Sequence, residues 1–333
     1  CVPTPFDQQR GVPDLSALLS ATSFIATHLQ KGQTIIYESS TYPGTTEEVI
    51  LPILEQSGLT VGRDFYLGYS PERIDPGNKQ YHLSNIPKVV SGVTNNCLEK
   101  VVALYQLCFD QVVPVSSPRV AELCKLFENI QRLVNISLVN EMDVICHKMG
   151  ISFRESLQAA ATKPFGFTPY YPGPGIGGHC IPVDPQYFQW KAAQQGLRSK
   201  IIDEALRVNQ HMPGEVVALI ESKLNKECIS RTMKPRIMLI GLTYKKDVRD
   251  LRESPALEIF GQLLNKGYHV EYHDPLVPKI KLNQEWRHSV SLTGEKIQEA
   301  HVVAILTDHS TIDWTLVKKE ANQIVDTRGV TDN

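Results

Sequence analysis

The chain has 333 residues, of which 42% are hydrophobic and 21% are charged, and this composition is typical of a soluble globular protein of two or three domains. The 34 basic residues nearly balance the 36 acidic ones, so the net charge of −2 offers no basic field for nucleic acid. The longest apolar runs, such as 237–242, are too short to cross a membrane, and nothing at the start reads as a signal peptide. Nucleic-acid and membrane partners are therefore not expected.

The cysteines and histidines argue against a metal or a disulfide framework. The seven cysteines are scattered, odd in number and never form a C-x-x-C pair, which favours a reducing cytoplasm over disulfides or structural zinc. The ten histidines show no H-E-x-x-H or comparable ligand spacing. The prediction is a cytoplasmic protein without a metal site.

The first part of the chain alternates strands with helices. Strands are predicted at 34–37, 65–69, 89–92 and 112–115, and helices at 14–30, 45–54 and 96–107. This alternation implies a parallel α/β sheet, in which the loops after the carboxyl ends of the strands build the site. Two polar loops, 39–44 and 70–77, fall there. Glu72, in the second loop, is either an ordinary exposed acid or a functional group.

A long helix follows. Ser117-Pro118 is a helix start signal, and the apolar periodicity continues to about Met149, before Gly150. Lys125, Asn129 and Arg132 share one face of this helix. The stripe is either the solvated side or, because asparagine is a weak helix former amid apolar neighbours, the wall of a polar pocket.

The stretch 173–185, with four glycines and three prolines, is predicted to be a shaped loop because both residue types disfavour regular helix and strand interiors. It presents Cys180, with Asp184 four residues on. A cysteine framed by glycines, with an acid nearby, is a candidate nucleophile. The alternative is a tight turn around a buried, inert cysteine.

A second α/β unit is predicted after a helical region at 186–226, in which Pro213-Gly214 is expected to interrupt the helix and mark a domain boundary. Strands are expected at 237–240, 268–272, 302–306 and 323–325, and a helix at 254–265, as in half of a doubly wound fold. The first strand-to-helix loop lacks G-x-G-x-x-G and is basic instead. It is either a phosphate-binding loop or a solvated surface loop, with cations at Lys245, Lys246, Arg249 and Arg252.

Taken together, ordered motifs along nearly the whole chain resemble those of the nucleotide-sugar 6-dehydrogenases, the family of UDP-glucose and GDP-mannose dehydrogenases. The motifs are Ser40-Thr41-x-Pro43, Ser70-Pro71-Glu72, Lys125-x-x-x-Asn129, Gly177-Gly178-x-Cys180-x-x-x-Asp184, Lys245-Lys246-Asp247 with Arg252-Glu253-Ser254, and Asp326-Thr327-Arg328-Gly329. The residues around Glu72 and Cys180 resemble those of the branch that oxidises UDP-N-acetylhexosamines. UDP-glucose enzymes commonly carry lysine where Val183 stands.

The resemblance implies an α/β fold of two Rossmann-like doubly wound parallel-sheet domains joined by a helical central region. The expected domains are 1–116 for NAD, 117–212 for dimerisation with the catalytic loop, and 213–333 for UDP. The family's G-x-G-x-x-G fingerprint and the acid that follows it are expected before residue 1. The first domain is therefore expected to be incomplete, in an N-terminally truncated chain whose own activity is in question.

The implied reaction is a four-electron oxidation of a sugar C6 alcohol to a carboxylate, with two NAD⁺ and one water. Cys180 would form a thiohemiacetal and then a thioester. Lys125 would favour the thiolate and, with Asn129, stabilise the oxyanion, while Asp184 would orient water, Glu72 would be the hydrolytic base and Thr41 would order water. The implied substrate contacts are Glu72, Arg73, Lys125, Asn129, Tyr170, Tyr171, Gly177, Lys245 and Arg328, and the implied NAD contacts are Thr4, Thr41 and Arg252.

Several functions stay open at this point. UDP-N-acetylglucosamine is the first-choice substrate, with UDP-N-acetylmannosamine or UDP-glucose as alternatives, and the product would feed surface polysaccharide synthesis. A non-catalytic nucleotide-sugar binding remnant is a further possibility. A thiol-dependent aldehyde dehydrogenase or an acyl transferase would also use a glycine-framed cysteine, but neither accounts for the basic loop and the Asp-Thr-Arg-Gly ending. The resemblance also implies a homodimer.

Overall fold

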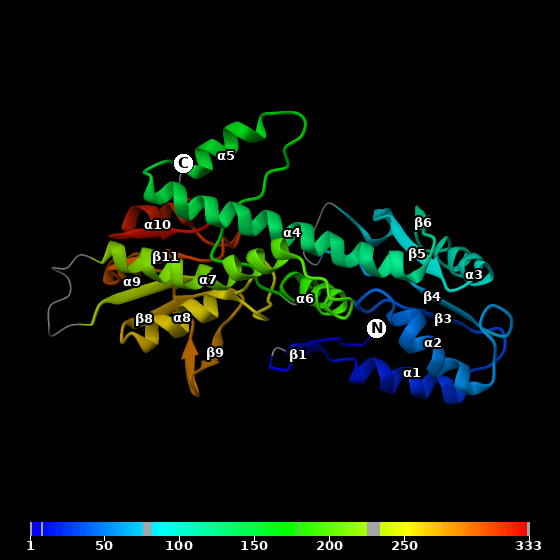
Figure 1. Cartoon of the computed structure of the whole chain (residues 1–333). Coiled ribbons are helices and arrows are strands. Elements are labelled where there is room, and N and C mark those ends of the chain that lie inside the picture. The colour runs from blue at the N-terminus through cyan, green and yellow to red at the C-terminus, as the bar shows by residue number, and fades with distance from the viewer. Residues whose placement is uncertain (1, 8, 76–80, 179, 225–233, 332–333) are drawn as a thin grey trace. The chain divides into compact units, whose positions relative to one another are not determined.

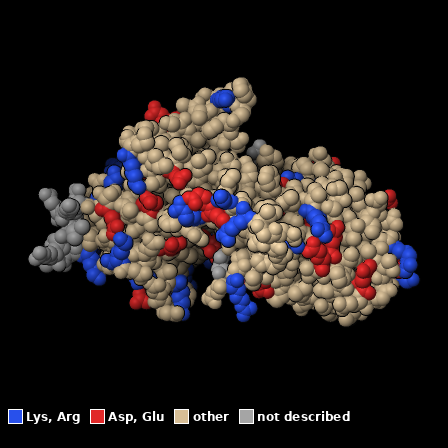
Figure 2. Space-filling model, viewed as in Figure 1, with Lys and Arg blue, Asp and Glu red and all other residues tan. Residues whose placement is uncertain are grey.

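The computed structural model describes residues 2–7, 9–75, 81–178, 180–224 and 234–331 (Figure 1). The chain divides into two compact units, Cys1–Arg132 with Val183–Lys200, and Leu133–Pro182 with Ile201–Asn333. None of the helices in the described residues has both the length and the apolar character that crossing a membrane requires. Figure 2 shows acidic and basic side chains interspersed on the face in view.

The first unit is built on a four-stranded sheet in the order β3-β4-β5-β6. Each predicted strand and helix of this region is present to within a few residues. The elements are the hairpin β1 (Phe6–Asp7) and β2 (Val12–Pro13), α1 (Ser16–His28), β3 (Thr34–Tyr37), the π-helix η1 (Thr45–Ile50), α2 (Leu51–Leu54), the 3₁₀ turn η2 (Glu55–Ser57), β4 (Tyr66–Tyr69), the 3₁₀ turn η3 (Leu83–Asn85), β5 (Lys88–Gly92), α3 (Asn95–Tyr105) and β6 (Val112–Pro114).

One strand pair of this sheet departs from the predicted parallel arrangement. β3 pairs in parallel with β4, and β5 with β6, but β4 and β5 are antiparallel, with Gly68 opposite Gly92. A parallel pair needs a crossover, usually a helix. The described part of the connection from β4 to β5 contains only the short turn η3, so the chain returns along the same sheet in the opposite direction.

The second unit carries a fully parallel sheet in the order β12-β11-β7-β8. Side chains alternate between its faces. Ile237 and Leu239 pack with the helices α7 and α8, whereas Met238 and Ile240 pack with α9 and α10. Helices on both faces make it doubly wound, as predicted. Its elements are α5 (Phe153–Ala161), β7 (Arg236–Ile240), α8 (Pro255–Asn265), β8 (His269–His273), the hairpin β9 (Lys279–Leu282) and β10 (Glu285–His288), α9 (Gly294–Glu299), β11 (Val302–Ile305), α10 (Trp314–Glu320) and β12 (Ile324–Asp326).

Three long helices complete the chain: α4 (Pro118–Lys148), α6 (Cys180–Ala193) and α7 (Lys200–Lys223). The predicted interruption at Pro213-Gly214 is wrong, because α7 continues through both residues. A proline inside a helix costs about 3 kcal/mol. Burial of Met212, Val216 and Val217 offsets that cost, since each buried apolar side chain contributes about 1.5 to 3 kcal/mol. The domain boundary placed at 212/213, like that at 116/117, stays a prediction.

Candidate active site

A buried carboxylate on α6 is hydrogen-bonded to the long helix α4 in the first unit. The side-chain amide of Asn129 donates to Asp184 Oδ2 across 2.6 Å, and the two residues are only 5% and 1% exposed. Burial raises the pKa of Asp184 to about 6, although the Asn129 amide and the nearby Lys125 charge oppose the rise. Lys125 lies one turn before Asn129 and is half-buried. Its side chain makes no hydrogen bond or ion pair with the described residues. The structure therefore brings together Lys125, Asn129 and Asp184.

The loop after β3 carries a buried hydroxyl with no partner. Thr41 is 3% exposed, and its Oγ1 has no hydrogen bond within the described part of the chain. The neighbouring backbone is tied down, since Thr4 Oγ1 donates to the carbonyl of Ser40 (2.8 Å) and the Thr4 carbonyl accepts from the hydroxyl of Tyr187 (2.8 Å). An orphaned buried hydroxyl is costly unless something else satisfies it. The predicted cofactor residue Thr4, in the segment before β1, is thus hydrogen-bonded to the loop that carries Thr41.

Glu122, on α4, holds the other end of this loop. Its carboxylate accepts from the backbone N–H groups of Gly44 (2.6 Å) and Thr46 (2.9 Å) and from the Thr46 hydroxyl (2.7 Å). These N–H groups lie at the start of η1, where they have no partner inside the helix. Burial raises the pKa of Glu122 to about 7, against the effect of the three donors. Sequence reasoning missed this residue, whose only signal was an acid on the apolar side of a predicted helix.

Glu72 and Arg73 follow β4, as predicted, but their contacts differ. Glu72 Oε1 accepts from the backbone N–H of Ile74 (2.6 Å), so the carboxylate folds back on its own loop. Arg73 donates to the carbonyl of Pro87 (2.7 Å) and forms an ion pair with Glu128 of α4 (2.8 Å). Among the described residues, the Glu72 carboxylate makes no hydrogen bond or ion pair with Lys125 or Asp184. Its role as a base stays a prediction.

Cys180 is exposed and is the first residue of α6, which belongs to the second unit up to Pro182 and to the first unit from Val183. The prediction that the whole stretch 173–185 is a loop is therefore wrong from Cys180 onward. Pro182 fits a first helical turn, whose N–H groups have no intrahelical acceptor, and Pro185 is tolerated within the helix. Asp184 lies one turn after Cys180 along the same helix. The alternative of a buried cysteine is excluded, because Cys180 is exposed. His179 lies outside the described residues.

The glycines before Cys180 allow close backbone packing. Gly178 adopts φ +83°, a left-handed conformation that favours glycine, and a Cβ there would stand 2.9 Å from the Tyr244 ring. A Cβ on Gly177 would stand 2.6 Å from the Glu253 carbonyl oxygen. The Gly178 N–H donates to the carbonyl of Arg252 (2.9 Å). The glycine loop is thus packed on the loop between β7 and α8.

The Arg252 side chain is near enough to Cys180 for their charges to interact. Its guanidinium is 65% exposed and pairs with Asp250 across 2.7 Å. The hydrogen bond to Asp250 raises the pKa of Arg252, and the Cys180 sulfur adds a smaller electrostatic contribution in the same direction. A cation in this position favours a thiolate. The predicted contact of Arg252 with the NAD pyrophosphate stays a prediction.

Arg328 and Gly173 meet at the other end of the glycine loop. A Cβ on Gly173 would stand 2.8 Å from the Arg328 guanidinium, whose Nε donates to the carbonyl of Leu306 (2.8 Å). Desolvation lowers the pKa of Arg328. Two asparagines that sequence reasoning missed hold this loop: Asn140 Oδ1 accepts from the Gly173 N–H (2.9 Å), and Asn209 Oδ1 accepts from the Ile176 N–H (2.6 Å).

Lys245 lies in the loop after β7 and is half-buried, whereas Tyr171 is 55% exposed and Tyr170 half-buried in the segment before the glycine loop. A separate cavity of about 790 Å³, lined by parts of α4, α5, α7 and β12, contains none of the predicted site residues. The predicted contacts of Tyr170 and Tyr171 with the UDP-sugar stay predictions.

The residues present fit part of a nicotinamide dinucleotide. The orphaned Thr41 hydroxyl stands after the carboxyl end of β3, where α/β sheets bind nucleotides, and offers a polar partner to the cofactor or to an ordered water. Elsewhere, within the described ranges, no group of three or more His, Cys, Asp or Glu side chains is arranged to hold a metal ion.

Comparison with known protein families covers most of the chain. Residues 1–108, 119–211 and 238–333 match, respectively, the NAD binding domain, the central domain and the UDP binding domain of the UDP-glucose/GDP-mannose dehydrogenase family. The first of these matches agrees with the predicted cofactor, NAD.

Individual relatives agree with this family assignment. The UDP-N-acetyl-D-glucosamine 6-dehydrogenase of Pseudomonas aeruginosa is 42% identical over 83% of this chain and 65% of its own length. That of Salmonella typhi is 37% identical over 92% of this chain and 71% of its own. The structure of a UDP-D-ManNAc dehydrogenase from Pyrococcus horikoshii is 31% identical, with a TM-score of 0.86 over 98% of this chain and 76% of that one. The chain thus spans about two thirds of the length of these curated relatives. It belongs to the UDP-glucose/GDP-mannose dehydrogenase family.

Proposed function

We propose that this chain is the nucleotide-sugar oxidising part, or the whole, of an NAD-dependent 6-dehydrogenase acting on a UDP-N-acetylhexosamine, with UDP-N-acetylglucosamine as the first-choice substrate. The observation that carries the proposal is the exposed Cys180 at the start of α6, one helical turn before Asp184, which accepts a hydrogen bond from Asn129. The names of the Pseudomonas and Salmonella relatives support the glucosamine form, and that of the Pyrococcus structure supports the mannosamine form.

Cys180 supplies the covalent chemistry of this proposal. NAD, when bound, supplies the hydride acceptor for both oxidations. The Cys180 sulfur adds to C6 of the aldehyde to give a thiohemiacetal, and after oxidation the same sulfur holds the acid as a thioester. Water then adds to the thioester carbon, the C–S bond breaks, and the carboxylate and the thiol are released. A nucleophile is needed because an aldehyde must form a tetrahedral adduct before it can lose a second hydride.

The polar cluster of the first unit supplies charge and water orientation. Lys125 stabilises the developing oxyanion and favours the thiolate, and Asn129 assists as a hydrogen-bond donor. With a pKa of about 6, Asp184 is mostly ionised at neutral pH and so accepts hydrogen bonds from water. Glu72 acts as the base in thioester hydrolysis, and Thr41 orders a water through its otherwise unpaired hydroxyl.

Basic groups of the second unit bind the nucleotide sugar. Lys245 and Arg328 contact the UDP-sugar, and Gly177, which packs closely on the loop between β7 and α8, adds a backbone contact to it. Tyr170 and Tyr171 contact the sugar-phosphate, and Arg73 adds a substrate contact from the first unit. Arg252 binds the cofactor pyrophosphate, and Thr4 helps to place Thr41.

We further propose that the protein is a cytoplasmic homodimer joined through α4. Several apolar side chains of this helix remain exposed in the single chain. Their spacing of three or four residues, or multiples of it, places them on one face of the helix. They include Phe127 at 63%, Leu138 at 53% and Met149, just after the helix, at 64%. The seven scattered cysteines, none of them in a C-x-x-C pair, favour a reducing compartment.

The deciding experiment counts NADH formed per sugar consumed when the protein is mixed with NAD and each UDP-sugar in turn. Two NADH per UDP-N-acetylglucosamine would support the proposal. Turnover only with UDP-N-acetylmannosamine or UDP-glucose would change the substrate and keep the mechanism. If no UDP-sugar is oxidised, but calorimetry shows that UDP binds, the non-catalytic binding protein becomes the better description.

A further inference from the structure

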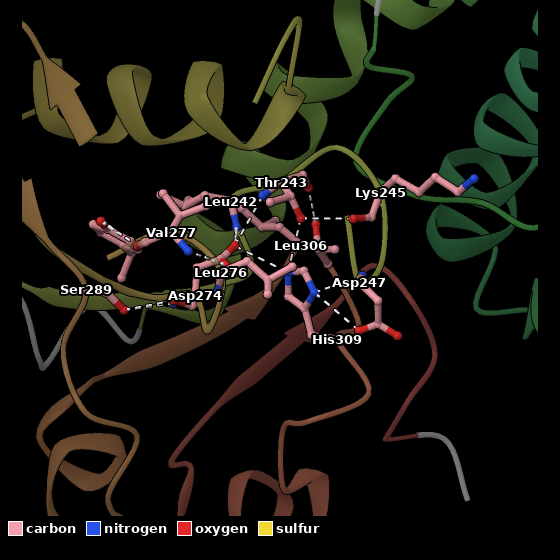
Figure 3. Close-up of polar contacts among 12 residues, drawn as sticks. Leu242, Thr243, Lys245, Asp247, Asp274, Leu276, Val277, Ser289, Leu306 and His309 are labelled. Carbon is pink, nitrogen blue, oxygen red and sulfur yellow. Dashed lines mark hydrogen bonds and ion pairs between the residues drawn. The ribbon is translucent and has the colours of Figure 1, made fainter. Parts of the chain in front are cut away.

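A buried polar network lies where β7, β8 and β11 end in the second unit (Figure 3). At its centre is His309, whose side chain is fully buried and lies four residues after the end of β11. Its Nε2 lies 3.1 Å from Thr243 Oγ1 and 3.3 Å from Asp274 Oδ2, and its Nδ1 lies 3.0 Å from the backbone N of Asp247. The imidazole therefore connects three segments that are distant in sequence.

The hydrogen bonds determine which ring nitrogen of His309 carries the proton. A backbone N–H can only donate, so Nδ1 accepts from Asp247 and is unprotonated. Nε2 consequently carries the proton and donates toward Thr243 and Asp274. Thr243 Oγ1 can accept because its own hydrogen is directed to the carbonyl of Lys245, 3.0 Å away. The neutral ring satisfies every one of these contacts.

Asp274 contacts the Nε2 side of His309. Its carboxylate accepts from the backbone N–H groups of Leu242 (2.6 Å), Leu276 (2.8 Å) and Val277 (3.1 Å), besides His309. Burial by itself would raise the pKa of Asp274, but the His309 and backbone donors outweigh it and lower the pKa. The carboxylate is thus held ionised and fixed to the ends of β7 and β8.

His309 in turn holds a strained residue beside Lys245. Asp247 has φ +58°, a left-handed conformation that is unfavourable for a residue other than glycine. Its N–H is held by His309 Nδ1, and its carboxylate accepts from the N–H (2.8 Å) and hydroxyl (2.5 Å) of Ser310. Lys245 stands two residues from each anchor, between Thr243 and Asp247.

We propose that His309 is a positioning residue for the nucleotide: by accepting the Asp247 N–H it fixes the 243–247 loop so that Lys245 is held in place for a uridine diphosphate group. This inference rests on the proposed function, because the proposed function assigns Lys245 to the UDP-sugar. A loop fixed before binding loses less conformational entropy when the ligand arrives, and affinity rises accordingly.

Two substitutions separate the two sides of the ring. In His309→Asn the amide oxygen lies near the position of Nδ1, so the variant keeps an acceptor for the Asp247 N–H but does not reach Asp274. In His309→Gln the longer amide reaches toward Asp274 and lacks that acceptor. Both variants keep a polar group and lose the contacts of one ring nitrogen. The readout is the Kd of UDP for the 333-residue chain by calorimetry, with the midpoint of thermal unfolding measured in parallel.

The expected result is a UDP affinity within about threefold of wild type for His309→Asn, and weaker by about tenfold or more for His309→Gln. His273→Asn is the matched control, because the His273 ring contacts the Val290 carbonyl rather than the Lys245 loop, and its UDP affinity should not change. Equal affinities for the Asn and Gln variants would overturn the proposal and leave His309 as a structural residue.

Hydrogen exchange keeps the inference separate from the proposed function and from any failure to fold. The Asp247 amide should exchange slowly in the wild-type chain without ligand. Fast exchange at that amide would contradict the anchoring role, whatever the ligand. If the wild-type chain does not bind UDP, the proposed function fails, and the exchange measurement still decides whether His309 anchors the loop.

Discussion

The side-chain amide of Asn129 donates to the Asp184 carboxylate across 2.6 Å, and this bond joins α4 to α6 within the first unit. Asp184 is 1% exposed, and burial raises its pKa to about 6, while Asn129 limits the rise by stabilising the ionised form. The pair therefore sets the pH at which a buried acid, one helical turn from the candidate nucleophile, is ionised.

Replacing Asn129 with alanine should move the acid limb of the kcat–pH profile to higher pH. The hydrogen bond that favours ionised Asp184 is lost, so the pKa of Asp184 rises further above about 6. The measurement is kcat between pH 5 and pH 9, with the exposed Gln131→Ala on the same helix as a control. An acid limb at the wild-type position would show that Asp184 does not govern it.

Replacing Cys180 with alanine should abolish carboxylate formation and leave the fold intact. The side chain is exposed, and substitutions at exposed sites usually change the free energy of unfolding by less than about 0.5 kcal/mol. Product analysis by mass spectrometry, beside thermal unfolding, tests both parts. Cys108→Ala, another exposed cysteine, should turn over normally. Normal oxidation to the acid by the Cys180 variant would rule out a covalent mechanism.

Replacing Lys125 with alanine should lower kcat by roughly 100- to 1000-fold, the usual effect of removing one oxyanion-stabilising group. Its charge also favours ionised Asp184, so part of the effect should appear as a shifted acid limb. Steady-state kinetics give the value, and Arg132→Ala on the same helix is the control. A loss smaller than about tenfold would remove Lys125 from the catalytic set.

Glu122 should make the protein less stable as pH rises. Its folded-state pKa is raised to about 7, above the value near 4.3 expected for the unfolded chain, so the folded state binds the proton more tightly. Proton binding to Glu122 therefore stabilises the folded state fully below about pH 4.3, and this stabilisation is lost as pH rises to about 7. Urea unfolding at several pH values should show a smaller fall for Glu122→Gln than for wild type. The exposed Glu99→Gln should behave as wild type, and an unchanged slope for Glu122→Gln would contradict the assignment.

Replacing Phe127 with glutamate should convert the proposed homodimer to a monomer. The side chain is 63% exposed in the single chain, and a charge buried at an apolar interface is strongly unfavourable. Light scattering after size exclusion gives the mass. Leu107→Glu is a matched control, since Leu107 is 80% exposed and lies outside α4. A dimeric Phe127 variant would move the interface elsewhere.

Local patterns predicted most of the secondary structure, whereas the roles of the proposed site residues stay predictions. The β-branched run at 34–37 and the start signal at Ser117-Pro118 gave β3 and α4 at nearly the predicted positions. The strand pattern also led to the doubly wound second sheet. These features depend on neighbouring residues, so a sequence contains them directly. The order of motifs around Cys180 and Arg328 indicated the family.

Other features depend on contacts between distant residues and needed the tertiary structure. The helix that starts at Cys180 contains the buried Pro185, which local sequence patterns disfavour in a helix. The antiparallel β4–β5 pair depended on the path of an intervening connection. The raised pKa of Asp184 arises from burial by other elements. His309, Asp274 and Asp247 meet only because parallel strands end at the same sheet edge, and no spacing in the sequence specifies that meeting.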